Sequence, residues 1–323
     1  MQALRELARQ LPPDFSAPIL IVQHMGPSAQ GTALVDSINQ SGQLRCRLAA
    51  DGDRLVNGAI LVAPPDHHML VKKGTVRVTK GARENRVRPA IDPLFRSAAV
   101  AYGSAVIALV LTGMLDDGTA GLTAVKACGG TCIVQQPDSA DYPAMPQSAL
   151  DTGKVDYCVK LGEMGQLLRT LVAKRPSRRR PVPPQIRVEA EIAERVLSDV
   201  SQVNALGRQV PYNCPNCGGV LWQVRKSNVH RYRCHTGHSF TAATLEASQV
   251  ERIEETLWIC MRMLEERKNL LRTTATREQQ QGFSKSARLQ RQRVTEIEVH
   301  IGRVREILLA STKAMSAGIE TKH

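Results

Sequence analysis

Two acidic residues and one histidine follow apolar runs in the first half of the chain, where they could carry out acid–base chemistry. Asp116 and Asp117 lie in a Gly-rich stretch, LTGMLDDGTAGL, that directly follows the apolar run 105–110. His24 follows a second apolar run at 18–22. Such runs are typical of strands covered on both faces, and parallel strands end at a common edge of a sheet. We therefore expect the imidazole and a carboxylate to meet at one sheet edge, where α/β enzymes build their sites.

Each of these side chains, taken alone, also has a structural interpretation. Either aspartate could cap the helix that we expect over 119–128. A single histidine is more often a hydrogen-bonded structural residue than a catalyst. It is the pairing of His24 with an acid at one edge that favours a catalytic function.

A second group of residues has the spacing of metal ligands. Cys214 and Cys217 form a C-x2-C pair, and after sixteen intervening residues Cys234 and His238 form a C-x3-H pair. Thiolates and an imidazole in a closed set of four ligands select zinc as a structural ion, and so small a segment needs such a metal to fold. His235 is the weaker candidate for the fourth ligand, because adjacent residues seldom both reach one tetrahedral centre. The alternative is a turn-rich loop without metal.

Strands and helices alternate around the first group, which predicts a mostly parallel, doubly wound α/β sheet. The expected strands are 19–23, 105–111 and 131–135, the expected helices are 29–39, 92–102 and 119–128, and 44–79 is expected to be an irregular β region. His67 and His68 fall in that β region, and we interpret them as loop or packing residues.

Five segments of this region resemble the CheB-type protein-glutamate methylesterases. They are IVQHM, ILVAPPDHHM, IDPLFRSAA, LTGMLDDGTAGL and MPQSAL, which stand in the family's order over roughly 1–174. By this resemblance, His24 is the general base and Asp117 is the acid that orients it. The resemblance also implies that the backbone amide of Met114 helps to bind the oxyanion, and that Asp116 is a neighbour outside the triad.

The resemblance implies a hydrolase that removes methyl esters from glutamates of chemoreceptors or related signalling receptors, and that can deamidate glutamines by the same route. A serine would attack the ester carbonyl, the imidazole would take its proton, and water would hydrolyse the acyl-enzyme. The sequence shows no receiver-type phosphorylation domain, so the phosphorylation switch of the two-domain relatives has no obvious counterpart here. The alternatives are a non-catalytic adaptor and a nucleic-acid-binding zinc-ribbon protein.

The family's nucleophile lies in a Gly-x-Ser-x-Gly-Gly turn, after the first strand and just before a helix that resembles 2–7. We therefore expect the nucleophilic serine and its strand to be missing from the chain as given, which would leave little triad catalysis. A late start is favoured over a truncated gene or a natural non-catalytic relative, because loss of a strand would expose a sheet edge. Four other serines lack the context of a nucleophile elbow, and capping or turn roles are expected for them. They are Ser28, Ser104, Ser139 and Ser148.

The remaining sequence divides into further modules. A basic, Pro-rich stretch at 174–184 predicts an extended linker. The expected domains are a catalytic domain at 1–174 that lacks its first strand, a linker with a short helix at 175–206, a zinc ribbon at 207–240 and a helical hairpin at 241–323. Apolar residues recur at helical spacing in the hairpin, which predicts burial within it or in a homodimer.

Composition limits the partners and the compartment. No window approaches the roughly 18 continuous apolar residues of a membrane span, and no secretory leader is visible, so a cytoplasmic protein is expected. Five cysteines outside the C-x2-C and C-x3-H pairs show no disulfide framework and are expected to be mostly buried. A net charge of +13 suits nucleic-acid binding, but aromatic residues make up only 3% of the 323 residues, so stacking platforms are scarce and this function is disfavoured.

Overall fold

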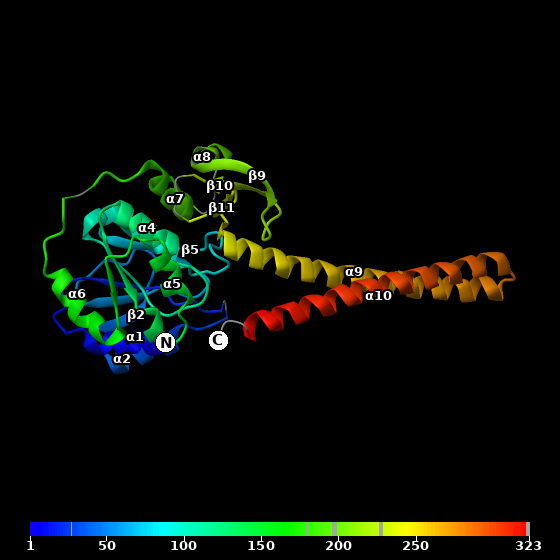
Figure 1. Cartoon of the computed structure of the whole chain (residues 1–323), viewed down its shortest axis with the longest axis horizontal. Helices are drawn as coiled ribbons and strands as arrows, with labels where there is room; N and C mark the ends of the chain where they lie inside the picture. The colour runs from blue at the N-terminus through cyan, green and yellow to red at the C-terminus, as the bar shows by residue number, and fades with distance from the viewer. Residues whose placement is uncertain (27, 179, 196–198, 226–228, 321–323) are drawn as a thin grey trace. The chain divides into compact units, whose positions relative to one another are not determined.

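Two parallel three-stranded sheets form the first half of the chain (Figure 1). One has the strand order β1 (Ile19–Ile21), β3 (Ala59–Val62), β2 (Arg45–Leu48), and the other has β6 (Ile107–Val110), β7 (Thr131–Gln135), β8 (Tyr157–Val159). The computed structural model describes residues 1–26, 28–178, 180–195, 199–225 and 229–320, with side chains as far as 310. The prediction of a parallel α/β sheet is confirmed in its class, but not as one continuous sheet. Among the described residues, β1 pairs only with β3, and β6 only with β7.

Helices connect and cover these strands. They are α1 (Gln2–Gln10), α2 (Thr32–Ser41), α3 (Ile91–Tyr102), α4 (Thr119–Ala127), α5 (Ala144–Asp151) and α6 (Met164–Val172). The irregular β region contains an antiparallel hairpin of β4 (His68–Lys72) and β5 (Thr75–Thr79), which turns at Gly74 with φ of 86°. The hairpin is tied to α3, because Val71 N donates to Ser97 Oγ at 2.9 Å.

The third region is a small antiparallel sheet preceded by two helices. The helices are α7 (Pro184–Arg195) and α8 (Val200–Leu206), and the sheet has the order β12 (Ser239–Thr241), β11 (Arg231–Cys234), β10 (Val220–Val224), β9 (Gly207–Asn213). We call residues 207–241 the ribbon. Its core contains Leu221, Cys234 and Phe240, none of which is exposed. The stretch between α6 and α7 has no regular structure in its described residues, and two helices follow it where the sequence predicts one short helix.

Buried ion pairs join the ribbon to the first half of the chain. Arg233 Nη2 donates to Glu84 Oε1 at 2.9 Å, and Arg96 Nη2 of α3 donates to Glu84 Oε2 at 2.5 Å. Glu189 of α7 accepts from both terminal nitrogens of Arg231, at 2.8 and 2.9 Å. Residues 1–245 therefore form one compact unit, where the sequence predicts separate modules. The difference arises because pairs so distant in the sequence leave no local pattern.

Replacing one acid of this network should destabilise the unit. Burial alone would raise the pKa of Glu189, but Arg231 and Arg96 hold it at about 2. We expect Glu189→Gln to lower the free energy of unfolding by about 3–5 kcal/mol, because Arg231 would stay buried without its counter-charge. Urea unfolding at neutral pH measures the change. Glu191→Gln, on the same helix, is the matched control, and an equal effect in both variants would contradict the prediction.

The second unit, 246–323, consists of most of α9 (Ala242–Gln280) and all of α10 (Ser284–Glu320). The two helices run antiparallel, because Arg272 Nη2 donates to Glu298 Oε1 at 2.5 Å and Arg291 Nη2 to Gln279 Oε1 at 3.3 Å. The break between the two helices lies at 281–283, where Gly282 has φ of 85°. Of the apolar residues at helical spacing, Val294 and Ile297 are buried, whereas Ile253 is 60% exposed.

The eight cysteines form no disulfide. Cys46, Cys128 and Cys132 are buried as expected, whereas Cys158 and Cys260 are exposed, because one lies on the three-residue edge strand β8 and the other on the outer face of α9. Within the described ranges, none of the helices is long and apolar enough to cross a membrane.

Candidate active site and metal cluster

His24 and Asp117 meet as expected, although they follow strands of different sheets. His24 lies three residues after β1, and Asp117 lies between β6 and α4. The distance from His24 Nε2 to Asp117 Oδ2 is 2.7 Å. The Asp117 side chain is buried, whereas that of His24 is 29% exposed. The pair therefore consists of a shielded carboxylate and an imidazole that a second group can still reach.

Asp117 lies against the amino end of α3. Its Oδ2 accepts from Ile91 N at 2.7 Å, and its Oδ1 accepts from Asn85 Nδ2 at 3.0 Å and from Asp92 N at 3.4 Å. Amide donors at the start of a helix favour a negative charge. Burial raises the pKa of Asp117, but His24 and these donors together hold it below its usual value. Asp117 is therefore ionised at neutral pH.

The carboxylate determines the properties of the imidazole. Burial lowers the pKa of His24, but the hydrogen bond and the charge of Asp117 more than offset this, so the pKa is raised above its ordinary value. When the neutral imidazole donates its Nε2 proton to Asp117, Nδ1 is left with a lone pair. Such a nitrogen can accept a proton as a general base.

Two polar residues that the sequence interpretation missed complete this cluster. Asn85 Nδ2 donates to Asp92 Oδ2 at 2.9 Å as well as to Asp117. Asp92 is buried, and burial together with the charge of Asp117 raises its pKa to about 7. Asp92 falls within the segment IDPLFRSAA, which could have directed attention to it, whereas no pattern in the sequence marks Asn85.

The loop between β6 and α4 presents an open amide. Both backbone groups of Gly113 are hydrogen-bonded: its N donates to Tyr142 O and its O accepts from Met145 N, both at 2.9 Å. The next residue, Met114, is 68% exposed, and no acceptor for its backbone N–H is found in the described part of the chain. Burial raises the pKa of Asp116, and Thr241 of the ribbon partly offsets this rise.

The other candidate residues have structural partners. Ser104 Oγ donates to Ser177 O, and Ser139 Oγ to Gln136 O. Ser28 is exposed, Ser148 lies within α5, and no described serine is hydrogen-bonded to His24. His68 is buried between Ala82 O and Ala90 N, and burial lowers its pKa. His67 Nδ1 bonds to the backbone O of Pro65, which suits the loop role expected of it.

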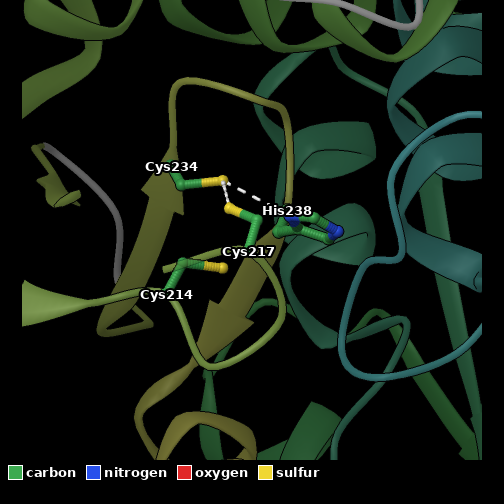
Figure 2. A group of neighbouring side chains, drawn as sticks. All are labelled: Cys214, Cys217, Cys234 and His238. Carbon is green, nitrogen blue, oxygen red and sulfur yellow. Dashed lines mark hydrogen bonds between the residues drawn. The ribbon is translucent and has the colours of Figure 1, made fainter. Parts of the chain in front are cut away.

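The four residues with metal-ligand spacing come together in the ribbon. Cys214, Cys217, Cys234 and His238 converge in Figure 2, and their ligand atoms lie within 4.8 Å of one another. The distance from Cys217 Sγ to Cys234 Sγ is 3.8 Å, and from Cys234 Sγ to His238 Nδ1 it is 3.5 Å. With metal–ligand bonds of about 2.3 Å to sulfur and about 2.0 Å to nitrogen, these separations match the edges of a tetrahedron. The donor set therefore fits zinc, and His235 is not part of the cluster.

Comparison with known proteins identifies the family to which the first half of the chain is similar. The sequence model of the CheB methylesterase family matches residues 1–168, slightly more than half of the chain. The chain belongs to the CheB methylesterase family. The crystal structure of the Thermotoga maritima CheB methylesterase catalytic domain is 34% identical, with a TM-score of 0.51 over 53% of this chain and 92% of that domain.

Individual relatives agree with the family assignment. A Paramagnetospirillum magneticum protein-glutamate methylesterase/protein-glutamine glutaminase is 41% identical over 162 residues, which cover 49% of this chain and 42% of the relative. A Leptospira interrogans relative named for the same pair of activities is 34% identical over 168 residues, which cover 52% of this chain and 86% of its own length. The matched region contains His24 and Asp117, whereas the ribbon and the two long helices lie outside it.

Proposed function

We propose that this protein is a protein-glutamate methylesterase that hydrolyses methyl esters on glutamates of chemoreceptors or related signalling receptors. The observation that supports this most is the 2.7 Å contact of His24 with Asp117 inside the region that matches the family. Two relatives carry both activities in their names, so we include deamidation of receptor glutamines in the proposal. In both reactions a carbonyl carbon is attacked and a small leaving group departs.

In the proposed mechanism, His24 moves the proton. A serine Oγ attacks the ester carbonyl while Nδ1 of His24 takes the hydroxyl proton, and Asp117 stabilises the imidazolium. The backbone N–H of Met114 donates to the oxyanion. His24 then protonates the departing methoxide, so that methanol leaves and an acyl-enzyme remains. Water attacks this ester with His24 again as base, which regenerates the serine and releases the glutamate carboxylate.

We place the nucleophilic serine on a further strand, outside residues 1–323, that fits between β1 and β6. Two features support this placement. Among the described residues, β1 and β6 each have one edge that pairs with no other strand. His24, which follows β1, and Asp117, which follows β6, are in contact, with 2.7 Å between Nε2 and Oδ2. A parallel strand that ended there would pair with both edges and bring a serine to Nδ1 of His24.

A serine-directed fluorophosphonate probe tests this placement. We expect it to label the product of the complete reading frame at a serine in a Gly-x-Ser-x-Gly-Gly turn, as located by mass spectrometry of the peptides. The protein of residues 1–323 and the His24→Ala variant of the complete product are the controls, and both should stay unlabelled. Absence of such a turn upstream, or of labelling at it, would favour the non-catalytic adaptor.

The activity should depend on pH through the protonation of His24. The base is active only when neutral, and its pKa is raised. We therefore expect kcat/KM to rise with pH through a midpoint above 6.5, and Asp117→Asn to move that midpoint downward. Initial rates of methanol release between pH 5 and pH 9 measure it. A midpoint below 6.5 in the unmodified enzyme would contradict this assignment of the base.

We further propose that Cys214, Cys217, Cys234 and His238 hold one structural zinc ion. The ion would stabilise the ribbon by closing its two ligand-bearing turns and would take no part in ester hydrolysis. The support for this site is geometric, because the four ligand atoms lie within 4.8 Å of one another and Cys214 and Cys234 are buried. Because metal ligands must be deprotonated, zinc binding should release protons and weaken at low pH.

A further inference from the structure

We propose that the ribbon is part of the active-site scaffold, and that it holds residues 83–85 in the position from which Asn85 keeps Asp117 against His24. Loss of the ribbon's metal would then disturb the His24–Asp117 pair, although the metal ligands belong to another part of the fold. Four sets of contacts, all within the unit 1–245, carry this inference.

The first set is a backbone pairing between the ribbon and the loop that precedes α3. Asn85 N donates to Ser239 O at 2.8 Å, and Ser239 N donates to Arg83 O at 3.4 Å. Glu84 and Ser239 thereby form a parallel β-bridge. Ser239 directly follows the metal ligand His238, so the residue that anchors this loop has its own position set by the cluster.

The second set joins the anchored loop to the catalytic acid. Asn85 has φ of 51°, a left-handed conformation that asparagine tolerates better than most residues. From this backbone its side-chain amide donates to Asp117 Oδ1 at 3.0 Å and to Asp92 Oδ2 at 2.9 Å. One amide group thus fixes two neighbouring carboxyl groups, and it can do so only while the backbone of Asn85 is held.

The third set passes through Arg233, which is fully buried. Its Nη1 donates to Gly237 O at 3.0 Å, inside the loop between the ligands Cys234 and His238. Its Nη2 donates to Glu84 Oε1 at 2.9 Å. Arg233 therefore connects the folded metal loop to the residue next to Asn85, and a metal loop that lost its shape would release this contact.

The fourth set is independent of the loop. Thr241, two residues beyond Ser239 on β12, acts on Asp116 by lowering the pKa that burial of this carboxyl raises. β12 therefore acts on both members of the acid pair: it anchors Asn85, which bonds to Asp117, and it carries Thr241, which affects the pKa of Asp116. The ends of the loop are fixed from elsewhere, because His68 bonds to Ala82 O and Ala90 N. The ribbon therefore holds only the middle of the loop, residues 83–85, and this is the part that contacts Asp117 through Asn85.

This inference rests on the proposed function for its kinetic consequence, but its test needs no catalysis. The test follows the pKa of His24 by NMR titration of protein labelled at histidine. The His24→Gln variant identifies the resonance, and Asp117→Asn gives the pKa of the imidazole without its carboxylate. We expect removal of the metal by a chelator to shift the pKa of His24 downward toward the Asp117→Asn value, while the His68 resonance shows that the core is still folded. An unchanged pKa of His24 after complete metal loss would overturn the inference.

A second variant decides the matter if the metal-free protein does not keep its fold. Arg233→Met, studied with metal bound, removes the link to Glu84 but leaves that carboxylate paired with Arg96. We expect the same downward shift in the pKa of His24. Arg208→Gln is the control, because Arg208 is an exposed ribbon residue whose side chain bonds only to Gln223 in the described chain. A wild-type pKa in the metal-loaded Arg233→Met protein would overturn the inference, and so would an equal shift in both variants.

Discussion

Asp117→Asn should lower kcat for ester hydrolysis by about 10⁴-fold in the enzyme that carries the nucleophile, with little change in KM. The factor is the one seen when the orienting aspartate of a Ser-His-Asp triad becomes asparagine. The amide would present a donor or a neutral oxygen to Nε2 of His24, so that neither the tautomer nor the imidazolium would be stabilised. Asp117 is buried, so we expect the substrate to make no direct contact with it and KM to change little.

Rates of methanol release from a methylated receptor fragment measure this effect. Asp36→Asn is the control, because it makes the same chemical change at an exposed position on α2. It should keep the wild-type rate. A loss of less than tenfold in Asp117→Asn would mean that another residue orients His24, and the assignment of the triad acid would fail.

Cys234→Ala should abolish metal binding and unfold the ribbon. In small zinc modules, the apparent binding free energy at neutral pH is on the order of 10 kcal/mol or more and contributes directly to folding. Cys234 is at the centre of the cluster, since its sulfur lies 3.8 Å from Cys217 Sγ and 3.5 Å from His238 Nδ1. Its loss leaves three ligands in a segment with few other large side chains.

Metal content and thermal unfolding of the purified protein measure this effect. We expect one zinc ion per chain in the unmodified protein and none in Cys234→Ala. Cys260→Ser, an exposed cysteine of α9, should keep its zinc. His235→Asn should keep it too, because the ligand cluster contains His238 and not His235. Zinc retained in Cys234→Ala at full stoichiometry would contradict the proposed ligand set.

The residues of both candidate sites could be identified from the sequence because they are marked by local signals. His24 and Asp117 follow apolar runs that become parallel strands, and the carboxyl ends of such strands lie close together. The four metal-binding candidates are marked by their spacing alone. The alternation of strands and helices likewise predicted the α/β class, although β1 and β6 are shorter than the apolar runs suggest.

What surrounds the His24–Asp117 pair could not be predicted, because it depends on contacts between distant segments. Asn85 acts through a left-handed backbone conformation that no periodicity reveals. The docking of the ribbon depends on Glu84 and Arg233, which are 149 positions apart. Charged residues at such positions are expected at the surface unless their partners are known. For this reason the sequence predicted a separate ribbon, where the structure has one joined unit.

The central claim is that the His24–Asp117 pair is the base and acid of a protein-glutamate methylesterase. The most direct test is the release of methanol from a receptor fragment that carries glutamyl methyl esters, measured with the product of the complete reading frame and with its His24→Gln variant. We predict release by the former and a loss of at least about 10³-fold in the latter. Equal rates in the two proteins, or no release by either on several methylated receptors, would contradict the account.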